Sequence, residues 1–321
     1  MEYAIGMKTQ YHKATRLDAR LASCAALLAA LFAPTAMADD ELSAPIDCGM
    51  CKEWNQPQKP FRIFGNAWYV GTKELSAILL TGNKGHILLD GALPQSAPLI
   101  AASIKEAGYD IKDVRLIVNS HPHFDHAGGL PALQRMSGAK VVASPASAKV
   151  LREGVLGPDD PQYDAKKVYR LDPVKKVNVV RDRETIYIGT IAVTAHLTPG
   201  HTPGSTTWSF RACENGGCLT MVYADSLNPV STDGFYFTGK GKEQPDITAQ
   251  FRQSIRKVAS LKCDIIVAAH PDLTNTMQKL AARTADENTF IEYEGCRDYA
   301  ADATKRLDKR IGTELAEKQK R

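Results

Sequence analysis

The sequence lacks a strong excess of charge of either sign. Its 321 residues include 40 lysines and arginines against 36 aspartates and glutamates, a formal net charge of +4. Proteins that bind nucleic acid usually carry a marked basic patch, so we expect no nucleic-acid partner. With 44% hydrophobic and 24% charged residues, the composition is that of a globular protein rather than a disordered one.

The sequence also lacks an apolar run that could anchor the mature protein in a membrane, which needs about 20 residues. The nearly uncharged segment 21–38 follows a basic region, is interrupted by Pro34 and ends in Ala-Met-Ala. These features are typical of a secretory signal peptide. We predict that residues 1–38 are removed, and that residues 39–321 form a single periplasmic domain without membrane contact.

Cysteine is scarce, but its number is informative. Of seven cysteines, Cys24 is lost with the signal peptide, and the remaining six suit disulfides in an exported protein. If cysteines close in the sequence pair with each other, two disulfides form and the two remaining cysteines make a third. Other pairings are formally possible. Residues 48–51 also have the spacing of a zinc-ribbon or redox motif, but no second Cys-x-x-Cys follows. The expected disulfides are Cys48–Cys51, Cys213–Cys218 and Cys263–Cys296.

Apolar periodicity predicts strands that alternate with helices. Strands are expected at 61–70, 76–81, 86–90, 114–120, 140–144, 177–180, 185–197, 206–211, 219–224 and 264–269. Helices are expected at 96–107, after residue 126, from residue 146, and at 245–261, 273–283 and 299–318. Residues 154–173 are rich in Gly, Pro and Asp and predict surface loops. The strands from residue 177 onward imply a second sheet, and the whole pattern predicts an α/β (α+β) fold with two packed sheets covered by helices.

The most informative motif lies at residues 121–126, which read His-Pro-His-Phe-Asp-His directly after a predicted buried strand. A lone histidine or an aspartate before a helix usually has a structural explanation, but four such side chains within six positions indicate a metal site. Alternate residues of an extended chain project to the same side. His121 and His123 can therefore share one cation, while Asp125 and His126 reach a second.

Two further histidines follow strands elsewhere in the chain. His201 lies in a turn, residues 198–205, whose prolines and glycines exclude a helix. His270 directly follows an apolar strand and precedes a proline. We do not predict His12, His86 or His196 as ligands, because they lie in the signal peptide or within strands.

These motifs resemble the metallo-β-lactamase fold superfamily over about residues 60–272. Trp54, the 60–61, 65–66 and 70–72 runs, Ser144-Pro145 and residues 224–227 resemble the third subclass of class B β-lactamases. The resemblance implies a four-layer αββα sandwich that binds two Zn²⁺ per chain. The implied ligands are His121, His123 and His201 for the first zinc, and Asp125, His126 and His270 for the second.

The resemblance further implies that a metal-bridging hydroxide hydrolyses the β-lactam amide bond of antibiotics and so confers resistance, with Asp125 as the catalytic residue that orients it. Ser226 and Asn228 are expected to bind the substrate carboxylate, although family members place a serine where Asn228 stands. Ser231 is an alternative, and such residues often serve turns alone. The expected partner is a small-molecule β-lactam, the expected state a monomer, and the loops around Trp54 and 154–173 should set substrate preference.

Other functions remain open at this point. A glyoxalase-II-like thioesterase or a lactonase of the same fold would resemble this chain in all six ligands. Such enzymes usually add an aspartate that bridges both metals, which Asp225 could supply. A non-catalytic zinc protein is less favoured, because structural zinc sites are typically rich in cysteine. The export signal and the expected disulfides favour a β-lactamase.

Overall fold

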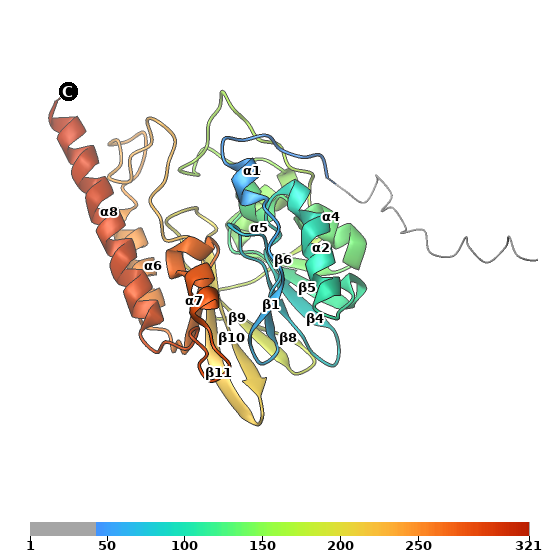
Figure 1. Cartoon of the computed structure of the whole chain (residues 1–321). Coiled ribbons are helices and arrows are strands. Elements are labelled where there is room, and N and C mark those ends of the chain that lie inside the picture. The colour runs from blue at the N-terminus through green and yellow to red at the C-terminus, as the bar shows by residue number, and fades with distance from the viewer. Residues whose placement is uncertain (1–42, 321) are drawn as a thin grey trace, which may run out of the picture. The chain divides into compact units, whose positions relative to one another are not determined.

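Two β-sheets packed face to face form the centre of the molecule (Figure 1). The structure is a computed structural model and describes residues 43–320. The first sheet contains, in spatial order, β1 (Phe61–Phe64), β2 (Ala67–Tyr69), β3 (Ile78–Leu80), β4 (His86–Leu89), β5 (Val114–Val118), β6 (Lys140–Ala143) and β7 (Val177–Val179). The second contains β12 (Ile265–Ala268), β11 (Gly217–Ala224), β10 (Thr206–Glu214), β9 (Ile191–Leu197) and β8 (Thr185–Ile188).

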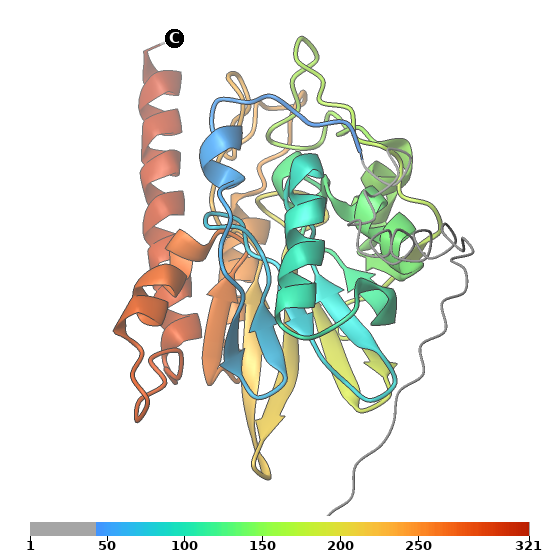
Figure 2. The same ribbon diagram turned by 45° about the vertical axis from the view of Figure 1, so that its right-hand side comes forward.

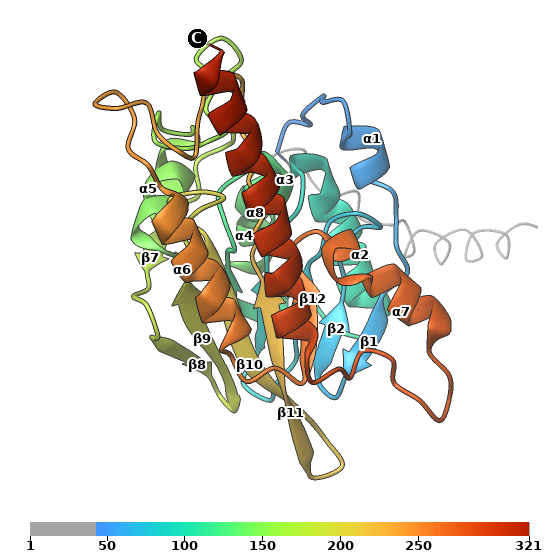
Figure 3. The ribbon, with the colours of Figure 1, turned by 90° about the vertical axis from the view of Figure 1, so that its left-hand side faces the viewer.

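Helices cover the outer face of each sheet (Figures 2 and 3). The first sheet packs against α2 (Ala97–Glu106), α4 (Leu130–Ser137) and α5 (Pro145–Glu153). The second packs against α6 (Thr248–Ala259) and α8 (Gly295–Gln319), which lie side by side. Short helices are α1 (Cys51–Trp54), α3 (Phe124–Ala127) and α7 (Thr276–Ala282). The predicted αββα sandwich is therefore confirmed.

The central strands are buried on both faces, which explains why they read as continuous apolar runs. In β4, Ile87 and Leu89 face the core between the sheets, and Leu88 packs under the helices of the first layer. In β11, Tyr223 faces the same core and Val222 packs under α6 and α8. Each strand thus joins two apolar layers of the sandwich.

The parallel strands place their carboxyl ends along one edge of the sandwich. Strands β4 to β7 run parallel in the first sheet, and β11 runs parallel to β12 in the second. Five of the six predicted ligands follow β5 or β12, the sixth, His201, follows β9, and Asp225 follows β11. In open α/β sheets this edge is where ligands bind.

Three predicted strands differ from the observed ones. The expected strand 61–70 is a hairpin of β1 and β2, because Gly65 adopts a positive φ of 52° and reverses the chain. The expected strand 185–197 is likewise a hairpin of β8 and β9, turned at Gly189 with φ 56°. Strand β7 was expected in the second sheet, but it pairs with β6 and forms the edge of the first.

The structure contains all three expected disulfides. Cys213–Cys218 joins facing residues of the β10–β11 hairpin, and Cys263–Cys296 ties the start of β12 to α8. Within residues 43–320, no helix has the length and apolar character needed to cross a membrane. The expected signal peptide, residues 1–38, lies outside the described residues and stays a prediction.

Candidate metal centre

The first predicted ligand set comes together from both sheets. His121 and His123 lie in the short segment between β5 and α3, and His201 lies in the turn between β9 and β10. His121, His123 and His201 are all buried, and their ligand atoms lie within 4.8 Å of one another. Three imidazoles are a typical donor set for zinc in a catalytic site.

In His121 and His201, a partner on one ring nitrogen leaves the other nitrogen for a metal, whereas both nitrogens of His123 have partners, Asp160 and Gln162. His121 has Nδ1 2.8 Å from Asp225 Oδ1, whereas its buried Nε2 has no hydrogen-bond partner. His201 donates from Nδ1 to the carbonyl oxygen of Asn228 at 2.7 Å, which leaves its Nε2. Such partners orient metal-binding histidines and fix their tautomers. An unpartnered buried nitrogen at this point fits a bound metal ion.

The second predicted set converges on a neighbouring point. Asp125 and His126 are presented by the single turn of α3, and His270 directly follows β12. The Nε2 atoms of His126 and His270 lie 3.1 Å apart, and Asp125 Oδ2 lies 3.2 and 3.3 Å from them. The imidazoles of His121 and His126 have centroids only 4.3 Å apart, so the two clusters are adjacent. Their nitrogen and carboxylate donors suit two zinc ions.

Burial and neighbouring charges favour the metal-binding protonation states of His121, His201 and Asp125, whereas at His123 burial lowers the pKa but Asp160 outweighs it and raises the pKa above its ordinary value. Burial holds the pKa of His121 well below its ordinary value, and burial together with His123 lowers the pKa of His201 to about 3. Burial alone would raise the pKa of Asp125, but His126 and His270 overcome this effect and hold it well below its ordinary value. Neutral imidazole and ionised carboxylate are the ligand forms.

A buried carboxylate supports the strand end that carries the ligands. Asp90, at the end of β4, accepts hydrogen bonds from the Ser120 backbone at 2.7 Å and its hydroxyl at 2.6 Å. Asn119 Nδ2 and the Tyr223 hydroxyl also donate to it, at 3.0 and 2.8 Å. Asp90 therefore fixes the backbone directly before His121. Sequence reasoning missed this role, although a carboxylate at the end of the neighbouring parallel strand was a usable signal.

A cleft of about 260 Å³ opens onto both ligand clusters. Ser226 and Asn228 line it, as expected, and the buried Ser226 hydroxyl has no hydrogen-bond partner. Trp54 also lines the cleft, with its ring centroid 5.7 Å from that of His270. Ser231 instead accepts a hydrogen bond from Arg310 of α8 at 2.8 Å. Ser226 is therefore better placed than Ser231 to meet a substrate.

Loop 154–173 contributes two residues that sequence reasoning missed. Asp160 is buried, and its Oδ1 lies 3.0 Å from His123 Nε2. Gln162 lines the cleft, with its side-chain nitrogen 3.2 Å from His123 Nδ1. The loop has no periodic pattern from which these inward positions could be read.

Comparison with known proteins agrees with this geometry. The model of the metallo-beta-lactamase superfamily matches residues 70–214. Among solved structures, Rm3 metallo-beta-lactamase is 46% identical with a TM-score of 0.81, covering 84% of this chain and 100% of that one. The chain belongs to the metallo-β-lactamase family. MEM-A1, a subclass B3 metallo-beta-lactamase isolated from a soil metagenome library, is also 46% identical, with a TM-score of 0.79 and coverage of 82% and 99%.

Curated proteins that are less similar to this chain are named hydroxyacylglutathione hydrolases. A hydroxyacylglutathione hydrolase of Cereibacter sphaeroides is 24% identical over 199 residues, or 62% of this chain and 63% of that protein. One of Maricaulis maris is 32% identical over 108 residues, or 34% and 32%. This chain thus spans less than two thirds of the length of these two curated relatives, whereas it spans the whole length of the Rm3 structure.

Proposed function

We propose that this chain hydrolyses the β-lactam amide bond of antibiotics with two zinc ions bound per chain. One observation carries the proposal: six ligands converge in two adjacent clusters within a chain that is 46% identical to metallo-β-lactamases over their whole length. His121, His123 and His201 would hold the first zinc. The second would be held by Asp125, His126 and His270.

Bound zinc supplies Lewis acidity and lowers the pKa of a coordinated water to about 7, so that a nucleophile exists at neutral pH. The chain's own residues position the reaction. Asp125 lines the cleft with one carboxylate oxygen among the ligand nitrogens, so it can accept a hydrogen bond from the attacking water and orient it. Trp54 and His123 both line the cleft and would contact the substrate.

Ser226 and Asn228 are proposed to bind the carboxylate that β-lactam antibiotics carry beside the ring. Ser226→Ala is expected to raise KM about tenfold with a smaller change in kcat, because a hydrogen bond to a charged group contributes about 1.5–3 kcal/mol. Steady-state kinetics with a chromogenic cephalosporin measure both constants. Ser231→Ala is the matched control, since Arg310 holds that hydroxyl. A larger KM change for Ser231→Ala would contradict this assignment.

Thioester hydrolysis is the competing function, because the curated relatives are hydroxyacylglutathione hydrolases. That reading would use Asp225 as a ligand of both metals. Asp225 instead lies against Nδ1 of His121, while the unpartnered Nε2 is the nitrogen left for a metal. Within the described residues, the two side-chain groups that could hold an ion include neither Asp225 nor His270, and neither oxygen of the buried Asp225 carboxylate has a hydrogen-bond partner. The preference for β-lactam hydrolysis therefore rests on the 46% identity to metallo-β-lactamases rather than on the position of Asp225.

A direct comparison of substrates tests the proposal. Zinc-loaded protein is expected to open a chromogenic cephalosporin with a kcat/KM at least about 100 times that for a glutathione thioester, a difference of about 2.7 kcal/mol in transition-state binding. Faster thioester cleavage would favour the competing function. No cephalosporin turnover at all would rule out the proposed one.

Export to the periplasm is part of the proposal. It is supported by the signal-like segment 21–38 and by three disulfides, which persist in oxidising compartments. Sequencing the N-terminus of protein from a periplasmic extract tests it, with Asp39 expected as the first residue. Material that retains Met1 would contradict cleavage after Ala38.

A further inference from the structure

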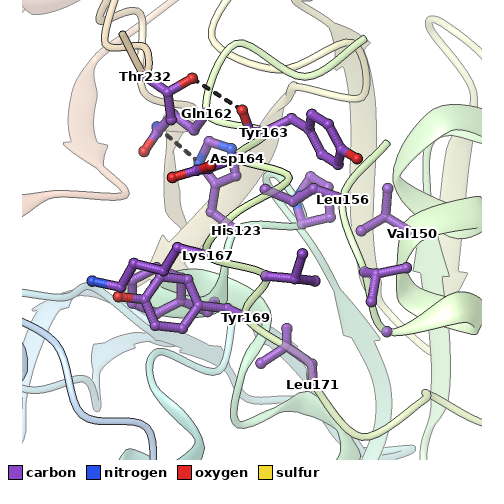
Figure 4. Close-up of a pocket in the computed structure, with 15 residues that line it drawn as sticks. His123, Val150, Leu156, Gln162, Tyr163, Asp164, Lys167, Tyr169, Leu171 and Thr232 are labelled. Atoms are coloured by element: carbon purple, nitrogen blue, oxygen red, sulfur yellow. Dashed lines mark hydrogen bonds between the residues drawn. The ribbon is translucent and has the colours of Figure 1, made fainter. Parts of the chain in front are cut away.

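His123 is held by a loop that contributes none of the proposed ligands. Loop 154–173 connects α5 with β7, and it walls both the cleft and a second, more apolar cavity beside it. His123 and Gln162 line both spaces, and Figure 4 shows them among the residues that line the second cavity, several of which belong to the loop. The contact between loop 154–173 and the proposed metal ligand His123 thus lies at the cleft where the substrate would bind.

Two neighbours specify the same tautomer of His123. Its Nε2 lies 3.0 Å from Oδ1 of Asp160, an acceptor when ionised, so Nε2 carries the hydrogen. Its Nδ1 lies 3.2 Å from the side-chain nitrogen of Gln162, a donor, so Nδ1 carries the lone pair. With Nε2 held by Asp160, Nδ1 is the His123 nitrogen that a metal would use, and the Gln162 amide would release it on metal binding.

Asp160 is itself firmly placed. The same Oδ1 accepts a hydrogen bond from the backbone of Gln162 at 2.8 Å, and the Asp160 backbone bonds to Gly157 and Tyr163 at 3.0 Å each. Thr232 holds the next residues, donating to the carbonyl of Tyr163 at 3.0 Å. With 3% of its surface exposed, the carboxylate has little solvent to compete with these partners.

We propose that Asp160 is the positioning residue of the first metal site, fixing His123 with Nδ1 toward the metal while anchoring Gln162 at the cleft wall. The proposal rests on the proposed function, since it assigns a role within that zinc site. Partners of this kind typically change metal affinity or activity by about 10–100-fold. Loop 154–173 is thereby coupled to metal binding through one carboxylate.

The test compares three variants. Asp160→Ala is expected to weaken binding of one of two zinc ions by about 10–100-fold in competition with a chromogenic chelator. Asp160→Asn keeps an acceptor oxygen and should restore affinity to within a few fold. Asp159→Ala, which removes an exposed carboxylate from the same loop, should leave it unchanged. The kcat of Asp160→Ala should fall at limiting zinc and recover when zinc is in excess.

A second readout needs no metal. Ring ¹⁵N shifts of His123, recorded on the metal-free protein at a pH where the imidazole is neutral, should show the Nε2-protonated tautomer in wild type and Asp160→Asn, and a mixture in Asp160→Ala. An Nδ1-protonated wild type, or wild-type zinc affinity in Asp160→Ala, would overturn the inference. A wild-type protein that binds no zinc would instead overturn the proposed function, and the tautomer measurement would still judge Asp160.

Discussion

Replacing Asp125 by alanine is expected to lower kcat for cephalosporin hydrolysis by about 10²–10⁴-fold, the range typical of a positioned acid or base. Asp125 is the one carboxylate in the two ligand sets, and its Oδ2 lies 3.2 Å from His126 Nε2 and 3.3 Å from His270 Nε2. The variant therefore loses a metal ligand and the acceptor that orients the attacking water. Steady-state rates at saturating substrate and zinc provide the measurement.

The fold should survive this change. Asp125 lies in the short helix α3 beside the cleft, where alanine is compatible with helical backbone. Asp302→Ala, which removes an exposed carboxylate from α8, serves as a control with wild-type kcat. Circular dichroism should show the same spectrum for all three proteins. A fully active and folded Asp125→Ala protein would contradict the role assigned to this carboxylate.

Removal of zinc by a chelator is expected to reduce hydrolysis below detection and to lower the unfolding temperature. A ligand that binds only the folded state stabilises it by about 2.7 kcal/mol when present at 100 times its Kd. Chelation removes that contribution at each occupied site. Rates and thermal unfolding curves should be measured before chelation, after it, and after zinc is added back.

Restoration by zinc separates metal loss from damage to the protein. Dialysis without chelator is the control and should change neither quantity. Metal-free protein that retains most of its rate would exclude zinc catalysis. Elemental analysis of the active protein should find two zinc ions per chain, and a ratio near one would show that one of the two clusters suffices.

The ligands could be predicted because each follows a strand or lies in a recognisable turn. His121 and His270 directly follow apolar runs, and parallel strands bring such positions to one edge. The packing of the two sheets, by contrast, cannot be read from local pattern, so the proximity of His201 to His121 was predicted only through the family resemblance. The hairpins at Gly65 and Gly189 were missed because each turn has only two residues, Gly65-Asn66 and Gly189-Thr190, between strands that are apolar at both sides.

The supporting residues were the harder part of the site to predict. Asp160 lies in a segment without periodicity, and only its burial beside His123 reveals a role. The sequence predicted Asp90 only as the last residue of a strand. Its hydrogen bond with the Ser120 backbone depends on the pairing of β4 with β5, which local pattern does not reveal. The sequence allowed Asp225 as a possible metal ligand. It could not show that the Asp225 carboxylate faces Nδ1 of His121, because this contact depends on the side-chain arrangement.

Each proposed zinc ion would be bound by residues from both halves of the sandwich. The first joins residues after β5 to His201 of the second half, and the second joins α3 to His270. The two ions would then act as cross-links between layers that otherwise adhere through apolar packing. Scarcity of zinc would accordingly reduce the enzyme activity of a cell in two ways. The metal-free molecules would be inactive, and their lower stability would make them more susceptible to proteolysis.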